Sequence, residues 1–185
     1  RLTRITCFTN LLTSLDVQAL PNLEALYVNG NLISSLDVHG LARLQIFHCG
    51  NNLLSSINVQ GCVWLNNFQC WNNSLTSLNL FGLTNLRTLD CQGNLLQYID
   101  IQSSPYFGNL TCNDNQLLGL NMKNGVGSNA PGYFLNFINN PNLQYICADE
   151  NEESFVQNLI NTYGYSSTCH VNSYCIAGQV GVSYT

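Results

Sequence analysis

One repeat constrains this chain more than any other feature of its sequence. Asparagine recurs at intervals of 21 residues, without a slip, over six consecutive units. The six positions are Asn10, Asn31, Asn52, Asn73, Asn94 and Asn115. Such a period is typical of solenoids, in which each unit forms one coil and contacts only its neighbours.

Apolar residues hold fixed places around each of these asparagines. Five columns run through the six units, five and three residues before the asparagine and two, five and seven residues after it. They are Ile5, Leu26, Phe47, Phe68, Leu89 and Leu110; Cys7, Val28, Cys49, Cys70, Cys91 and Cys112; Leu12, Ile33, Leu54, Leu75, Leu96 and Leu117; Leu15, Leu36, Ile57, Leu78, Ile99 and Leu120; and Val17, Val38, Val59, Leu80, Ile101 and Met122. No unit can bury such a stripe alone, so we expect the units to stack, at about 4.8 Å per coil, around one continuous core.

The unit reads L-x-x-L-x-C-x-x-N-x-L-x-x-L-D-V-x-x-L-x-x, as in residues 23–43, where valine stands at the cysteine position. Its first half resembles the leucine-rich repeat signature, and the match extends over residues 2–124. The short unit resembles a bacterial subclass with an extended segment on both walls of the coil. The resemblance implies a leucine-rich repeat solenoid of parallel β ladders and 21-residue coils, mainly β with a single C-terminal capping helix.

We interpret the asparagine and cysteine columns as structural. An inward asparagine offers donors and an acceptor to the backbone of the turn, and so links one coil to the next. Four thiols in a row cannot surround one metal ion, and parallel neighbours present their Cβ atoms poorly for a disulfide. Because Val28 occupies the same column, Cys49, Cys70, Cys91 and Cys112 are expected to be small buried hydrophobic residues.

The period ends after Met122, and we divide the chain there. Residues 1–124 are interpreted as the repeat array of about six units, truncated at its N-terminus. Residues 125–175 are expected to hold an irregular coil and a C-terminal cap, because an open solenoid needs covered ends. Residues 176–185 are interpreted as a tail or a linker to a missing downstream domain.

Within the cap, Phe134 and Phe137 are expected in apolar positions, and a last strand is expected within residues 140–148. A helix over about 152–163 follows, with Asn151 as its N-cap. Carboxylates gather around the start of this helix, at Asp149, Glu150, Glu152 and Glu153. They are favourable there because of the helix dipole, and their spacing is not that of a calcium loop, so we expect no metal site.

Residues 140–149, with the segments 164–165 and 171–175, resemble the cap of secreted leucine-rich repeat surface proteins of Bacteroidetes. That resemblance implies a secreted or cell-surface location. We therefore interpret the chain as one module of a longer surface protein.

Three cysteines fall in the cap, which permits one disulfide. A bond between Cys147 and Cys169 would tie the last strand to the segment that follows the helix. The pairings Cys147–Cys175 and Cys169–Cys175 remain open.

The charge of the chain excludes several classes of partner. Charged residues make up 8% of the sequence, against about 25% in a typical domain. The net charge is −5 with only five Lys and Arg residues, so the clustered cations that bind nucleic acid phosphates or anionic membranes are missing. No apolar run approaches the roughly 18 residues of a membrane-spanning helix, so we expect no membrane insertion. A monomeric module is expected.

The residues that flank the inward columns point outward from the first sheet, and their chemistry varies. They form three ladders: Arg4, Ala25, Ile46, Asn67, Thr88 and Asn109; Thr6, Tyr27, His48, Gln69, Asp90 and Thr111; and Phe8, Asn29, Gly50, Trp71, Gln92 and Asn113. Solenoids bind through such irregular faces on regular scaffolds. The candidate binding residues are Tyr27, His48, Gln69, Trp71, Asp90 and Gln92.

Catalysis has little support in the sequence. His48 and Asp90 share a ladder two rungs apart, about 9.6 Å, which exceeds hydrogen-bond reach. No phosphate-binding glycine loop, nucleophile elbow or zinc-protease motif is present, and we expect no catalytic residue and no cofactor. The leading hypothesis is a non-catalytic extracellular recognition or adhesion module that binds a protein or a glycan. The alternative is a structural spacer that displays a neighbouring domain of a larger secreted protein.

Overall fold

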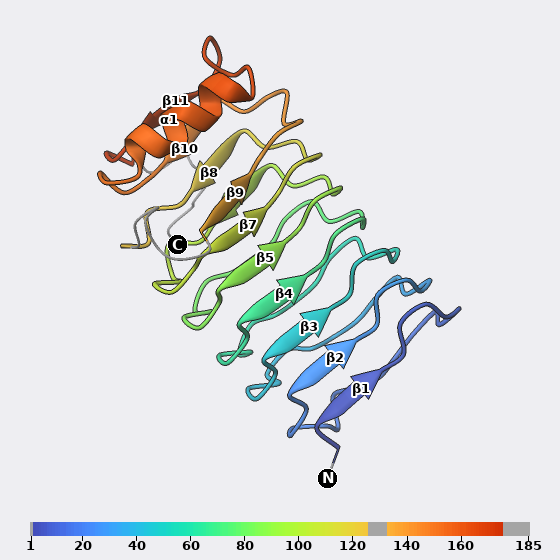
Figure 1. The fold of residues 1–185 in the computed structure, drawn as a ribbon. Helices are drawn as coiled ribbons and strands as arrows, with labels where there is room; N and C mark the ends of the chain where they lie inside the picture. Colours follow the sequence, from blue (N-terminus) through green and yellow to red (C-terminus); the bar gives the residue numbers. More distant parts are fainter. Residues whose placement is uncertain (1, 126–132, 176–185) are drawn as a thin grey trace.

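The structure is a computed structural model that describes residues 2–125 and 133–175 of the 185-residue chain. Coils stack into an elongated solenoid whose paired strands are all parallel (Figure 1). The first sheet has seven strands: β1 (Arg4–Thr6), β2 (Ala25–Tyr27), β3 (Ile46–His48), β4 (Asn67–Gln69), β5 (Thr88–Asp90), β7 (Asn109–Thr111) and β9 (Phe134–Asn136). The predicted loop over 126–132 and the tail over 176–185 lie outside the described residues.

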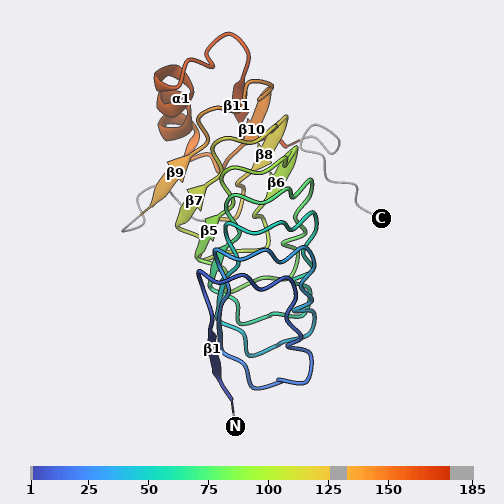
Figure 2. The ribbon, with the colours of Figure 1, turned by 90° about the vertical axis from the view of Figure 1, so that its right-hand side faces the viewer.

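The second sheet lies on the opposite wall of the coils, toward the C-terminal end of the stack (Figure 2). Its four strands are β6 (Tyr98–Asp100), β8 (Gly119–Asn121), β10 (Tyr145–Cys147) and β11 (His170–Asn172), in the spatial order β11-β10-β8-β6. Earlier coils form only the isolated bridge between Asp37 and Asn58 on this wall. There the Asp37 carboxylate accepts a hydrogen bond from the backbone N–H of His39 (2.9 Å), a side-chain turn that competes with regular pairing.

The register of the first sheet follows the repeat. Leu26 lies opposite Phe47, and Phe47 lies opposite Phe68, whose ring stacks on that of Phe47 at a centroid distance of 5.4 Å. In β3, β4, β5 and β7 the middle residue is buried and its two neighbours are half-buried. The predicted solenoid of parallel ladders, with 21-residue coils and a C-terminal helix, is confirmed.

Each inward asparagine joins two successive coils. Asn52 donates to the carbonyl of Val28 in the preceding coil and to that of Cys49 in its own, both at 3.0 Å. Its Oδ1 accepts a hydrogen bond from the backbone N–H of Ile33, also at 3.0 Å. The same pattern recurs at Asn31, Asn73, Asn94 and Asn115. Asn10, in the first coil, donates to two carbonyls of that coil.

The seventh coil is four residues longer than the others. Leu117 donates its backbone N–H to Asn140 Oδ1, 23 residues away, whereas the equivalent bonds in earlier coils join residues 19 apart. Asn140 therefore extends the asparagine column, which the sequence analysis ended at Asn115. Leu135 and Phe137 point inward and are buried, whereas Phe134 is 52% exposed. The expectation for Phe134 was wrong, because alternation along β9 places residues 134 and 135 on opposite sides.

Helix α1 (Glu153–Thr162) covers the C-terminal end of the stack (Figures 1 and 2). Val156 and Ile160 are its buried residues, and the Phe137 ring of the seventh coil packs edge-on against Tyr163 at 5.0 Å. The expected N-cap at Asn151 was wrong. The N-cap residue is Glu152, which is 1% exposed and makes no side-chain cap bond.

The cap does not end at the expected last strand. That strand is β10, and β11 pairs beyond it, with Ile146 opposite Val171. The disulfide joins Cys147 to Cys175, and Cys169 is a buried free thiol. This pairing is one of the three that the cap cysteines permit by sequence.

Candidate binding face

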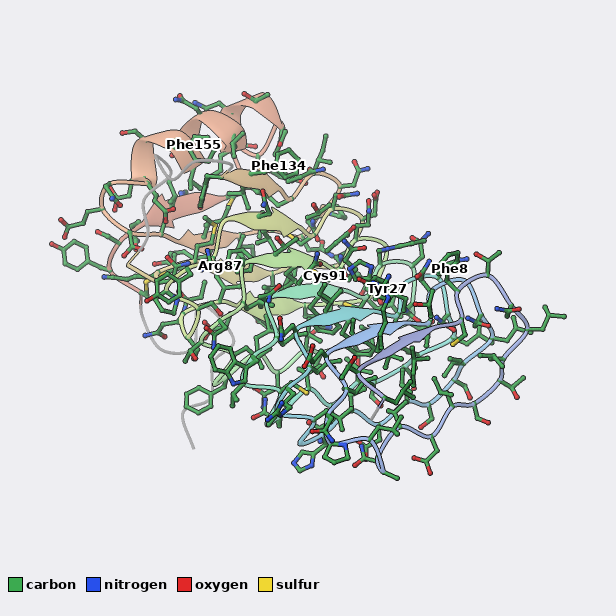
Figure 3. All side chains as sticks on the ribbon, turned by 60° about the horizontal axis from the view of Figure 1, so that its bottom comes forward. Phe8, Tyr27, Arg87, Cys91, Phe134 and Phe155 are labelled. Carbon is green, nitrogen blue, oxygen red and sulfur yellow. A yellow bond between two sulfur atoms is a disulfide. The ribbon has the colours of Figure 1, made fainter. Side chains whose placement is uncertain are left out.

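We define the outer face as the three outward ladders of the first sheet, each extended by one residue of the seventh coil: Phe134, Asn136 and Ile138. In Figure 3, Phe8 in the first coil and Phe134 on β9 mark its two ends, and Tyr27 on β2 lies one rung in from Phe8. In each three-residue strand, the first and third side chains point outward. The residue two positions after the strand supplies the third outward side chain of the rung. The rungs lie about 4.8 Å apart, so side chains of neighbouring coils meet directly.

The half of the outer face nearer the N-terminus is aromatic. The Arg4 guanidinium lies over the Tyr27 ring at 4.7 Å, and Tyr27 packs edge-on against His48 at 4.9 Å. His48 Nε2 lies 3.3 Å from Asn67 Oδ1 on the next rung, which fixes the orientation of the imidazole. Burial lowers the pKa of His48 below its ordinary value, although the Asn67 hydrogen bond and the charge of Asp90 act in the opposite direction. The neutral imidazole is therefore favoured at neutral pH.

Trp71 lies against the preceding coil, over Gly50. A Cβ atom added to Gly50 would clash with Cε2, Nε1 and Cδ2 of the indole ring. The φ angle of Gly50 is not in the left-handed region, so the backbone conformation does not by itself require glycine. Glycine is needed at position 50 because the indole of Trp71 occupies the space.

The other half of the outer face is a chain of polar side chains. Asn136 donates to Asn113 Oδ1 (3.2 Å), Asn113 donates to Gln92 Oε1 (3.3 Å), and Gln92 Nε2 donates to Asp90 Oδ2 (3.3 Å). The backbone N–H of Gln92 also donates to Asp90 Oδ1, at 3.3 Å. Burial raises the pKa of Asp90, and the bonds from Gln92 and the nearby His48 oppose that rise.

The structure places the six candidate residues in two neighbouring groups. Tyr27 and His48 touch and Trp71 covers the rung of His48, whereas Asp90 and Gln92 belong to the polar chain. Gln69 lies between the groups on β4, and its side chain makes no hydrogen bond within residues 2–125 and 133–175.

Four further members of these networks were missed as site residues: Arg4, Asn67, Asn113 and Asn136. Three of them stand in the predicted ladders, on rungs next to candidate residues. That adjacency was the signal by which the sequence could have identified them as site residues. Asn136 follows the longer coil, where the 21-residue spacing no longer applies.

The inward thiols have different surroundings from the outer face. Cys49, Cys70, Cys91 and Cys112 are free and fully buried, and burial raises the pKa of each thiol. Cys62 is a further buried thiol, and it lies outside the cysteine column. Its Sγ donates to the Val38 carbonyl at 3.1 Å, and burial raises its pKa to about 11.

The described part of the chain contains no cluster of His, Cys, Asp and Glu residues suited to a metal ion. Among the same residues, no helix combines the length and the apolar character needed to cross a membrane.

Neither protein-family models nor curated protein sequences match this chain. Solved structures do resemble it, among them the two that follow. The functional domain of InlJ from Listeria monocytogenes, described as including a cysteine ladder, matches with a TM-score of 0.55 at 23% identity over 80% of this chain. A leucine-rich repeat protein of Leptospira interrogans matches with a TM-score of 0.67 at 20% identity over 92% of this chain. The chain spans 39% and 48% of these two proteins.

At these identities the comparisons establish architecture alone. The two alignments show that the stacked parallel coils of this chain follow the fold of both neighbours. The chain is a leucine-rich repeat solenoid.

Proposed function

We propose that this chain is a non-catalytic recognition module, located outside the cell, that binds a macromolecular ligand through its outer face. The observation that carries the proposal is the contrast between the two sides of the same strands. The inward columns repeat one chemistry, whereas the outward ladders combine aromatic, amide and carboxylate groups in fixed orientations. Groups that are oriented before binding lose less entropy when a ligand arrives.

The cap supports the proposed location. A disulfide joins Cys147 to Cys175, and such bonds persist in oxidising compartments. The sequence resemblance of the cap to secreted bacterial proteins points the same way. The module adheres to a protein or glycan on a surface or in a matrix.

The alternative function is a spacer that displays a neighbouring domain. The stacked coils form an elongated body whose rungs share one register, which favours this role independently of the outer face (Figure 1). A spacer needs its length and stiffness but does not need Tyr27, His48 or Trp71.

One pair of triple variants separates the two functions. The test variant carries Tyr27→Ala, His48→Ala and Trp71→Ala. The control carries Tyr106→Ala, His39→Ala and Trp64→Ala, the same three residue types at exposed positions off the outer face. Immobilised chain is exposed to a biofilm-matrix extract and to a glycan array. We expect the test variant to lose binding by roughly tenfold or more and the control to retain it. Equal retention by both variants supports the spacer.

A further inference from the structure

The pairing of Gly50 with Trp71 builds a flat aromatic platform. The three clashing indole atoms lie at almost the same distance from the added Cβ position, so the face of the ring, rather than its edge, covers Gly50. One face of the indole is therefore packed on the backbone of the third coil. Trp71 is half-buried, so part of the ring that is not packed on Gly50 stays accessible to solvent.

An aromatic ring held in this way suits a sugar. The axial C–H groups of a pyranose form an apolar face, and their attraction to the negative face of an indole adds to the apolar area that is buried. A ring already fixed by packing loses little rotamer entropy on binding. A protein anchor, by contrast, is generally an aromatic side chain that fills a pocket, and Trp71 lies flat on its own backbone.

Hydroxyl-binding groups flank this platform. Gln69 precedes Trp71 by two residues on the same outward side, and its unengaged amide offers donors and an acceptor. Gln92 follows on the next rung and is held between Asn113 and Asp90. The Asp90 carboxylate can accept further hydrogen bonds beyond the two from Gln92, because its two oxygens have about four acceptor sites.

The charge of the outer face favours an uncharged ligand. Arg4 and Asp90 are the only residues with formal charges on it, and the guanidinium of Arg4 is already engaged by the Tyr27 ring. Amides and hydroxyls make up most of the remaining positions. An anionic glycan or a nucleic acid would meet Asp90 with no cation beside Trp71 to offset it.

Building on the proposed recognition function, we infer that the ligand is a neutral glycan, with one pyranose ring stacked on the solvent face of Trp71. The amide and carboxylate groups of Gln69, Asp90 and Gln92 bind the ring hydroxyls. The aromatic and polar halves extend along the axis of the stack, so a linear oligosaccharide is accommodated better than a single sugar.

Tryptophan fluorescence gives a direct test, since the chain has two tryptophans. Trp64 lies off the outer face and is 58% exposed, so Trp64→Phe leaves Trp71 as the only indole. In this background, neutral linear hexasaccharides of β-1,4-glucose, α-1,4-glucose and β-1,4-mannose are titrated, after an array of neutral, sialylated and sulfated glycans. We expect a saturable change in Trp71 emission with at least one neutral glycan.

Two substitutions in the native background then locate the ring. Trp71→Ala removes the platform, and Gly50→Ala displaces it through the Cβ clash; each is expected to weaken glycan binding about tenfold or more. Trp64→Ala is the matched control and leaves affinity unchanged. Should Gly50→Ala perturb folding, as seen by circular dichroism, Trp71→Ala still decides the question.

The inference is overturned if no neutral glycan on the array binds, if only anionic glycans bind, or if Trp71→Ala leaves the affinity unchanged. Its failure is distinguishable from that of the proposed function. Suppose that the native chain binds no glycan but captures a matrix protein, and that the Tyr27, His48 and Trp71 triple variant loses this capture. The recognition function then stands, and its ligand is a protein.

Discussion

The inward and outward sides of each strand in this solenoid follow opposite rules. Inward, the same residue types recur in every coil, and Asn52 and its equivalents tie the backbone of one coil to the next. Outward, neighbouring rungs carry different residues, yet these contact one another across the rungs, as Tyr27 does with His48. Because the inward residues are alike in every coil, the coils pack on one another in the same way and stabilise the solenoid. The outward residues are therefore free to differ from coil to coil. Stability and recognition are therefore separable by mutation.

The largest effect is expected in the core. Phe68→Ala removes a fully buried ring that stacks on Phe47, and it should lower the free energy of unfolding by about 3–5 kcal/mol. Phe81→Ala is the matched control because its ring is 77% exposed, and it should cost less than about 0.5 kcal/mol. Urea unfolding followed by circular dichroism measures both. Similar losses in the two variants would contradict the division between inside and outside.

Cysteines test the same division at the other end of the molecule. Cys147 bonds to Cys175, 28 residues later, whereas the column thiols point inward. Reduction should destabilise the cap by about 3.5 kcal/mol in the chain-entropy model. Hydrogen exchange should accelerate in α1, β10 and β11 and stay unchanged in β3, β4 and β5.

The column thiols should resist alkylation in the native protein, since burial disfavours the thiolate and excludes the reagent. Non-reducing peptide mapping supplies the control. A linkage between any two of Cys49, Cys70, Cys91 and Cys112 would show that the register of the first sheet is wrong.

A smaller loss is expected from the asparagine column. Asn94→Ala leaves the backbone N–H of Leu75 and the carbonyls of Cys70 and Cys91 without their side-chain partner, at a cost of about 1–3 kcal/mol. Asn142→Ala, the same change at an exposed turn, is the control and should lie within about 0.5 kcal/mol of the native chain. Asn72 would serve poorly, because its φ of 48° strains an alanine. Equal thermal midpoints for the Asn94 and Asn142 variants would refute the role of the column.

The sequence predicted the repeat array well because six units report the same columns, so no single residue decides the register. The seventh coil does not share this spacing, so the other six units did not help to predict it. Its four extra residues moved Asn140 out of step and put Phe134 on the wrong side in the sequence analysis. The C-terminal cap has no repeat, so only local sequence signals could predict where its helix begins. These signals favoured Asn151 as the N-cap residue, whereas the N-cap is Glu152.

The disulfide pairing was undetermined for a related reason. Ile146 and Cys169 belong to the main core, whereas Cys147 lies on the other side of β10 with Tyr145, where Cys175 packs. The three cysteines could be sorted only once their sides of the strands were known. Likewise, Gly50 and Trp71 were adjacent in a predicted ladder, but the clash that explains the glycine is a property of side-chain direction.

The smallest effect concerns two carboxylates, Glu152 in the cap and Asp90 on the outer face. Burial raises the pKa of Glu152 above its ordinary 4.5, and hydrogen bonds from Tyr133 and from the Asp149 N–H only partly oppose the rise. Asp90 on the outer face shifts in the same direction, but it is half-exposed and solvent screens it. The side chain of Glu152 is almost wholly buried, so it should dominate any pH dependence of the cap.

The direction of this pH effect follows from proton linkage. A folded state that raises the pKa of Glu152 binds its proton more tightly than the unfolded chain does. The resulting stabilisation is full below about pH 4.5 and is lost as the pH rises through the folded-state pKa. Glu152→Gln cannot titrate, so thermal midpoints measured from about pH 4 to about pH 8 should decline less in this variant than in the native chain. Glu150→Gln, at an exposed carboxylate two residues earlier, should reproduce the native slope. Parallel curves for the native chain and Glu152→Gln would mean that Glu152 meets enough water or hydrogen bonding to ionise freely, and that the cap is less tightly closed than the array.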